Sequence, residues 1–215
     1  MKLLCSWSGG KDSCFALMNA VKAGHAPTVL LNMLNEQGKI SRSHGIPTQV
    51  LAAQAAAMGL PIHMIESSWN DYENNFISAL QLLRKQYQVE GAVFGDIDLQ
   101  AHRDWEEKVC AAADIEALLP LWQMRRKQLV IEMLAAGIAC MIVSCNEALG
   151  EAFLGKKMTL ELMGALESKG VDVCGENGEF HTLVTDCHLF LHPINVEISA
   201  KLKHGNYWFT DLRMM

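Results

Sequence analysis

The chain has 215 residues, 50% of them hydrophobic and 20% charged, which allows one large α/β domain or one domain with a modest C-terminal extension. The formal net charge is −6 and basic residues cluster only weakly, so a broad basic face for duplex nucleic acid is not expected. No apolar run reaches the roughly 18 residues of a membrane span, and the N-terminus does not resemble a signal peptide, so we expect a cytoplasmic protein.

Strands and helices alternate through the first half of the chain. Short apolar runs predict buried strands at 3–7, 29–34, 62–65 and 91–94. Helical spacing and composition predict helices at 13–21, 48–58, 71–87 and 99–113. This alternation indicates a doubly wound parallel α/β sheet covered on both faces, with the polar turns at 8–13, 35–44 and 95–103 converging beyond its carboxyl edge. Trp105 is expected in the core.

The pattern changes beyond about residue 120. We predict helices at 125–136 and 160–169, and β segments at 139–143, 182–185, 194–198 and 207–212. A soft domain boundary therefore divides residues 1–120 from a smaller C-terminal α+β domain, residues 121–215. The seven cysteines are widely spaced without a Cys-x-x-Cys pair, which predicts reduced, buried thiols.

The first predicted strand and the first helix are joined by a segment of small and polar residues, Ser8-Gly9-Gly10-Lys11-Asp12-Ser13. The first turn of a helix offers free N–H groups and a positive dipole end, which favour an anion. The two glycines let the backbone approach phosphate oxygens, while the serines and Lys11 add hydroxyls and a positive charge. Asp12 repels phosphate, so it is expected to face Mg²⁺ or to cap the helix. The segment predicts a phosphate-binding loop.

This loop differs from two common nucleotide-binding loops. A Walker A loop has four residues between its glycine and Gly-Lys-Ser/Thr, and the dinucleotide fingerprint reads Gly-x-Gly-x-x-Gly; neither spacing occurs at residues 8–13. The alternative is a glycine turn that happens to contain a lysine. The serine before the glycines and Lys-Asp-Ser after them favour nucleotide binding.

The loop resembles the PP-loop of the N-type ATP pyrophosphatases, a branch of the adenine nucleotide alpha-hydrolase-like superfamily. The resemblance implies a HUP-type sheet, with residues 1–120 as the PP-loop ATP-binding domain and residues 121–215 as a substrate-related domain. It also implies that the loop holds the β and γ phosphates of ATP. The bond between the α and β phosphates then breaks, AMP is transferred to a substrate, and pyrophosphate leaves.

Later segments carry a narrower resemblance: His44-Gly45-Ile46-Pro47, Gly95-Asp96-Ile97-Asp98, Arg103 with Glu107-Lys108-Val109-Cys110, Pro120-Leu121-Trp122, and Gly175-Glu176-Asn177-Gly178-Glu179-Phe180-His181. In this order they resemble the diphthine–ammonia ligase family over nearly the whole chain. Asn177 and His181 stand where archaeal and eukaryotic ligases usually have glycine and glutamate, which indicates a bacterial-type branch. Bacteria are not expected to contain diphthamide, so the acceptor of this branch stays open.

The resemblance implies roles for individual residues. The catalytic residues are expected to be Lys11, Asp12, Glu176 and Glu179, with Lys11 neutralising phosphate charge as pyrophosphate forms. The ATP-binding residues are expected to be Ser8, Gly9, Gly10, Lys11, Asp12, Ser13, His44, Gly95 and Arg103. Because Mg²⁺ prefers oxygen ligands, it is expected on Asp12, Asp96 and Asp98.

Several of these residues also have a purely structural interpretation. Asp96 and Asp98 are placed to cap the helix predicted from residue 99. Arg103 has the i,i+4 spacing for an ion pair with Glu107. The glutamates of residues 175–179 also fit a surface turn.

The sequence therefore predicts an ATP-dependent amide-forming ligase that produces AMP and pyrophosphate. A carboxylate attacks the α-phosphorus of MgATP, and ammonia or another amine then displaces AMP from the acyl-adenylate. The expected partners are a small-molecule or protein-borne carboxylate and ammonia; a homodimer is allowed, and neither a membrane nor nucleic acid is the default partner. Two alternatives stay open: an ATP- or AMP-binding sensor without net chemistry, and an enzyme that adenylates an RNA base.

Overall fold

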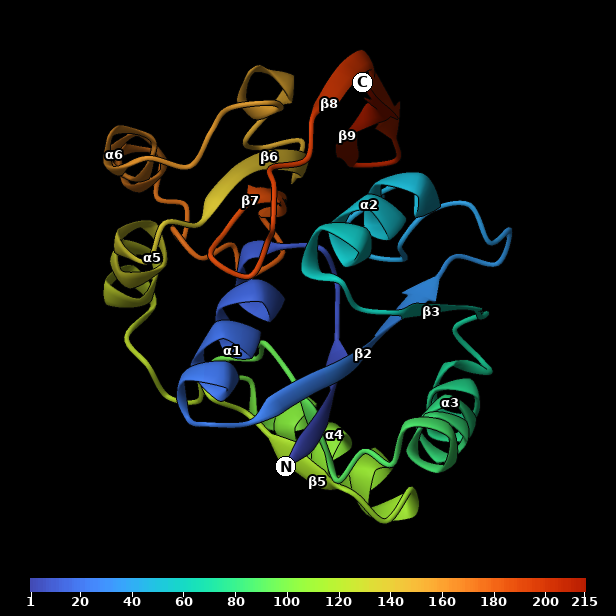
Figure 1. Ribbon diagram of the computed structural model, residues 1–215. Coiled ribbons are helices and arrows are strands. Elements are labelled where there is room, and N and C mark those ends of the chain that lie inside the picture. Colours follow the sequence, from blue (N-terminus) through green and yellow to red (C-terminus); the bar gives the residue numbers. More distant parts are fainter.

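The computed structural model describes all residues, 1–215, and forms two sheets (Figure 1). The first sheet is parallel, in the order β3-β2-β1-β4-β5, and its strands are β1 (Lys2–Ser6), β2 (Ala26–Leu34), β3 (Ile62–Glu66), β4 (Gly91–Val93) and β5 (Glu116–Leu118). The helices that connect these strands are α1 (Lys11–Lys22), α2 (Thr48–Met58), α3 (Tyr72–Tyr87) and α4 (Gln100–Ala112). The prediction of a doubly wound parallel α/β sheet is confirmed.

Both faces of this sheet are buried, because successive strand residues point into different cores. Leu3 and Leu30 pack with residues of α1 and α2, whereas Leu4 and Leu31 pack with residues of α3 and α4. This arrangement explains why the strands read as continuous apolar runs. The short β5 escapes sequence analysis because it has only three residues and begins with an exposed glutamate, Glu116.

The second sheet is antiparallel, in the order β7-β6-β9-β8. The C-terminal elements are α5 (Arg126–Ala135), β6 (Ala139–Asn146), the short helix η1 (Glu151–Phe153), α6 (Leu160–Ser168), β7 (Phe180–Asp186), β8 (Val196–His204) and β9 (Tyr207–Met214). In Figure 1 this sheet lies beyond α1 and α2. A core cluster of 42 buried residues runs from these helices into the second sheet, so the hydrophobic core continues across the predicted boundary at residue 120.

Two further expectations concern the whole chain. All seven cysteines are buried and free of disulfides, as predicted. None of the helices combines the length and the apolar composition that crossing a bilayer requires.

The loop after β1 is held in place by β7 and α2. The Val184 N–H donates to Gly9 O at 2.9 Å, and the Lys11 N–H donates to Thr182 Oγ1 at 3.0 Å. Gln54, which is fully buried, donates from Nε2 to Gly9 O and Val184 O and accepts from Trp7 Nε1. Three segments that are distant in the sequence are therefore joined at the loop.

We predict that Gln54→Leu lowers the free energy of unfolding by at least about 2 kcal/mol, because it leaves the buried Trp7 N–H without an acceptor. Urea denaturation measures the change. Gln49→Leu, at an exposed position of the same helix, is the matched control and should change stability by less than about 0.5 kcal/mol. Equal stability of the two variants would contradict the role of Gln54.

Candidate active site

A cavity of about 620 Å³ opens at the carboxyl edge of the parallel sheet. The three predicted turns meet here, together with segments after β3 and before β7. Of the residues predicted to bind or act, those that line the cavity are Ser8, Lys11, Asp12, Ser13, His44, Gly95, Asp96 and Glu176. The position agrees with the general placement of ligands in open α/β sheets.

The glycines allow a close approach of backbone at the loop. Gly9 has φ +85°, and a Cβ there would lie 2.9 Å from Gln54 Oε1. A Cβ on Gly10 would lie 2.7 Å from His44 Nε2, and one on Gly95 would lie 2.7 Å from Ser13 N. The hydroxyls of Ser8 and Ser13 are 3.0 Å apart. These contacts fit a tight, preformed cradle for the phosphates of a nucleotide.

Lys11 is a buried cation in the lining of the cavity, with 3% of its surface exposed. Its Nζ donates to the Asp12 carboxylate at 2.8 Å and to Cys174 O at 2.5 Å. Burial lowers the pKa of Lys11, but the charge of Asp12, its hydrogen bond to Lys11 and the charges of Cys174 and Glu176 together outweigh burial, so the pKa lies above its usual value. Lys11 therefore carries a positive charge next to the loop and the turn at Cys174.

Glu176 and Glu179 are only three positions apart but have different surroundings. Glu176 lines the cavity, and burial, followed by the charges of Asp12 and Asp96, raises its pKa to about 7. The carboxylate of Glu179 instead accepts hydrogen bonds from Asp172 N, Asn177 N and Asn177 Nδ2. Glu176 therefore faces the cavity, whereas Glu179 closes the turn that presents it.

The predicted Mg²⁺ ligands are not brought together as a set of three. Asp12 and Asp96 line the cavity, whereas Asp98 forms a two-pronged pair with Arg126 at 2.7 and 2.8 Å. No group of three or more His, Cys, Asp or Glu side chains is arranged to hold a metal ion. One or two carboxylates beside ATP phosphates suffice for Mg²⁺, so Asp12 and Asp96 fit that role.

The structural role that the sequence also allowed is found for Arg103 but not for Asp96 or Asp98. Helix α4 begins without a side-chain cap, so neither Asp96 nor Asp98 caps it. Arg103 pairs with Glu107 at 2.7 Å and stacks over Trp122, outside the cavity lining. The ion-pair interpretation of Arg103 is therefore the one that the structure shows.

Two histidines lie together over the loop. The rings of His44 and His181 are 4.5 Å apart at their centroids, and both line the cavity. Burial, followed by the charges of His181 and Lys11, holds the pKa of His44 well below its usual value, and burial lowers the pKa of His181 to about 4. Both are neutral near pH 7 and can donate one ring N–H to a phosphate oxygen.

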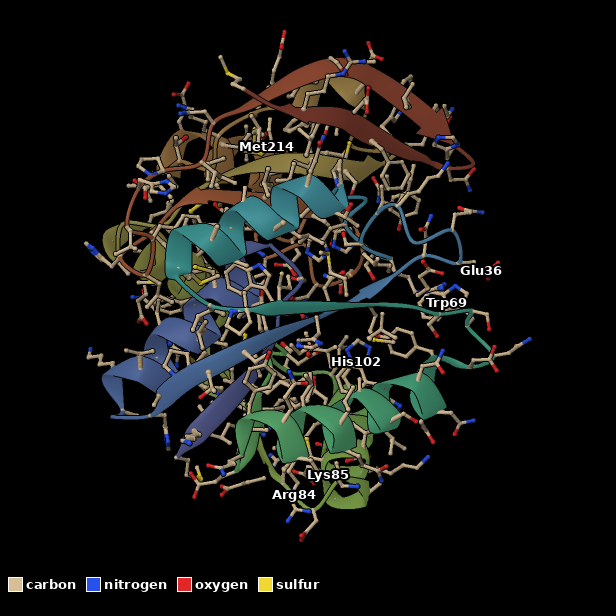
Figure 2. All side chains as sticks on the ribbon, turned by 45° about the vertical axis from the view of Figure 1, so that its right-hand side comes forward. Glu36, Trp69, Arg84, Lys85, His102 and Met214 are labelled. Carbon is tan, nitrogen blue, oxygen red and sulfur yellow. The ribbon has the colours of Figure 1, made fainter.

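Sequence reasoning missed the side of the cavity between α3 and α4. There Asp96 accepts from His102 Nδ1 at 2.6 Å, and burial, followed by Asp96, raises the pKa of Glu106 to about 10. Trp105, predicted in the core, packs against the smaller core cluster and also lines the cavity. In the view of Figure 2, Trp69 lies beyond the end of β3 and His102 between β3 and α3. The one sequence feature that could have indicated this side of the cavity is that Trp69 follows the carboxyl end of a predicted strand.

Two family models match the chain, described as diphthamide synthase N-terminal domain over residues 1–117 and diphthamide synthase C-terminal domain over residues 125–215. The diphthine–ammonia ligase of Homo sapiens is 29% identical, covering 95% of this chain and 86% of that protein. That of Danio rerio is 29% identical, covering 99% and 92% respectively.

Among solved structures, a predicted subunit of tRNA methyltransferase from Methanocaldococcus jannaschii is 16% identical, with a TM-score of 0.47. The match covers 87% of this chain and 98% of that chain. At that level of similarity it supports no conclusion about this chain.

We predict that the Glu176 carboxyl titrates with a midpoint of about 7, measured by carbon-13 NMR of labelled glutamate. Because the folded pKa is raised, the folded chain keeps a proton that the unfolded chain loses above a pH of about 4.3, so this group's contribution to stability falls as pH rises towards 7.

Asp12→Asn should lower this midpoint and Lys11→Met should raise it, since the charge of Asp12 raises the pKa and that of Lys11 lowers it. Asp114→Asn, at an exposed site beyond α4, is the control and should leave the midpoint unchanged. A midpoint near the ordinary glutamate value of about 4.3 in the unmodified chain would contradict the assignment.

Proposed function

This chain belongs to the diphthamide synthase family, and from that premise we propose that it is an ATP-dependent ligase that joins a carboxylate to ammonia. The observation that carries the proposal is the position of Lys11, which is buried in the phosphate loop and lines the same cavity as Glu176. A cation beside a glycine-rich turn suits a polyphosphate, and a carboxyl group in the same cavity suits proton transfer.

The loop supplies the groups for ATP. Gly9 and Gly10 leave room for phosphate oxygens, and Lys11 stabilises the negative charge that pyrophosphate gains as it leaves. Mg²⁺, held by Asp12 and Asp96, would neutralise phosphate charge and orient the leaving pyrophosphate. The neutral rings of His44 and His181 add hydrogen-bond donors without adding charge.

The reaction proceeds in two balanced steps. A carboxylate oxygen of the acceptor bonds to the α-phosphorus, the bond to the bridging oxygen of the β-phosphate breaks, and pyrophosphate leaves. The nitrogen of ammonia then bonds to the acyl carbon, the bond to AMP breaks, and one proton is released. Glu176, with a pKa of about 7, takes that proton when it is ionised.

The two alternative functions are not favoured. The curated relatives are ligases by name, and a sensor without net chemistry has no need for Glu176 in the same cavity as Lys11. Adenylation of an RNA base fits poorly with the net charge of −6. The names of the relatives support diphthine and ammonia as the first pair of substrates to test.

We predict that MgATP, ammonium chloride and a diphthine-bearing substrate yield AMP and pyrophosphate, identified by phosphorus NMR. Lys11→Met should reduce the rate at least about 100-fold, because the charge that stabilises the leaving pyrophosphate is lost.

Lys22→Met, in the last turn of the same helix and exposed, is the matched control and should keep the wild-type rate. Thermal melting of both variants checks that they fold. ADP and orthophosphate as products would overturn the proposed chemistry.

A further inference from the structure

Arg126, the first residue of α5, joins two turns that contribute to the lining of the cavity. Its Nε and Nη2 atoms donate to the two carboxylate oxygens of Asp98 at 2.8 and 2.7 Å. Its Nη1 atom donates to Asp172 Oδ2 at 2.6 Å and to Asn177 Oδ1 at 3.3 Å. Asp98 lies in the turn after β4, whereas Asp172 and Asn177 lie before β7, so a single guanidinium bonds to two segments that are far apart in the sequence.

Asp172 connects Arg126 to the turn that presents Glu176. Its Oδ1 atom accepts a hydrogen bond from Cys174 N at 3.1 Å, and its Oδ2 atom accepts one from Glu176 N at 3.3 Å. The side chain of Asp172 is 13% exposed. The Cys174 thiol also donates to the backbone oxygen of Arg126 at 3.0 Å. The backbone of the Glu176 turn is therefore held by a carboxylate that is itself bonded to Arg126.

Asp98 connects the same guanidinium to the turn that carries Asp96. Asp98 follows Asp96 by two residues, and Asp96 lines the cavity. A two-pronged pair between a guanidinium and a carboxylate fixes the relative orientation of both groups, which a lysine with its single nitrogen cannot do. With Asp98 and Asp172 as its partners, Arg126 sets the spacing of two turns that each contribute a carboxyl group to the cavity.

An ion pair that only adds stability is the alternative interpretation of Arg126. Exposed ion pairs contribute little, because water competes for both partners. Arg126 has 26% of its side chain exposed, and all three of its guanidinium nitrogens donate to acceptors. The pKa of Glu176 is raised by burial, followed by the charges of Asp12 and Asp96, whereas the positive charges of Lys11 and Arg126 lower it. Arg126 therefore affects both the position and the charge of Glu176.

We propose that Arg126 is a positioning residue that holds the Glu176 carboxyl group where amide formation releases its proton. This inference rests on the proposed function, because Glu176 is the proton acceptor in that reaction. Arg126 does not line the cavity, so it acts through Asp98 and Asp172 and not through contact with the substrates. Its removal should leave the phosphate loop in place, because that loop is held by β7 and α2.

The first measurement is the rate of AMP release from MgATP, ammonium chloride and a diphthine-bearing substrate. Arg126→Met should lower kcat at least about tenfold, while the KM for ATP changes by less than about twofold. Arg126→Lys keeps the charge but loses the two-pronged pair, so its kcat should stay well below that of the wild type although it restores the titration midpoint of Glu176. Arg125→Met, at the exposed neighbouring position, is the matched control and should keep the wild-type kcat.

The second measurement is amide hydrogen exchange of the full chain, which needs no substrate. In Arg126→Met, exchange at Cys174 and Glu176 should be at least about tenfold faster, because Asp172 holds their N–H groups less firmly. Exchange at Lys11, whose N–H bonds to Thr182, should be unchanged. Asp98→Asn is the second variant if Arg126→Met does not fold, and it should also speed exchange at Glu176.

Three results would overturn the proposal. A wild-type kcat in Arg126→Met that is folded by thermal melting would leave Arg126 a role in stability alone. A wild-type kcat in Arg126→Lys would assign its effect to charge and not to position, and unchanged exchange at Glu176 would remove the link through Asp172. Because the exchange experiment contains no ATP, its failure leaves the test of AMP and pyrophosphate release unaffected. Conversely, ADP as a product would overturn the ligase chemistry while the measured exchange stood.

Discussion

The phosphate loop depends on hydrogen bonds from a strand more than a hundred positions away in the chain. Val184 N–H bonds to Gly9 O and Lys11 N–H bonds to Thr182 Oγ1, so the backbone groups that a tight turn leaves unpaired are satisfied by β7. A buried N–H or C=O without a partner costs about 1–3 kcal/mol, which makes these bonds a strong constraint on the position of β7. Gln54 strengthens the constraint because it bonds to Gly9 and Val184 at once. The loop is therefore preorganised by the C-terminal half of the chain.

It follows that the two halves form one working unit. Lys11 reaches Cys174 O, and the turn that follows Cys174 presents Glu176 to the cavity. Glu179 holds that turn closed through three hydrogen bonds, so residues 175–179 contribute both a carboxyl group in the cavity and its support. The core cluster of 42 residues likewise contains residues from both sides of residue 120. A fragment ending near that residue would expose the Lys11 side of the loop.

The sequence alone was sufficient to predict the helices and strands that are indicated by local residue patterns. Continuous apolar runs and helical spacing placed β1, α1 and most of the other elements, and the glycines after β1 placed the phosphate loop. The direction of a side chain at a turn has no such signal. Asp96 and Asp98 were equally eligible for the cavity, and only the position of Arg126, whose helix packs from the other half of the chain, turns Asp98 away. Trp69 and Trp105 are 36 positions apart in the sequence. The packing of α3 against α4 brings both to the same side of the cavity.

Acidic side chains outnumber lysine in the lining of the cavity. The cavity lining includes a single lysine, Lys11, and four acidic side chains: Asp12, Asp96, Glu106 and Glu176. Burial reduces this imbalance by keeping protons on Glu106, with a pKa of about 10, and partly on Glu176, with a pKa of about 7. A metal ion held by Asp12 and Asp96 would lower the pKa of a nearby carboxyl group. Such an ion would shift Glu176 towards its ionised form. In that form Glu176 could take up the proton that the proposed amide-forming step releases.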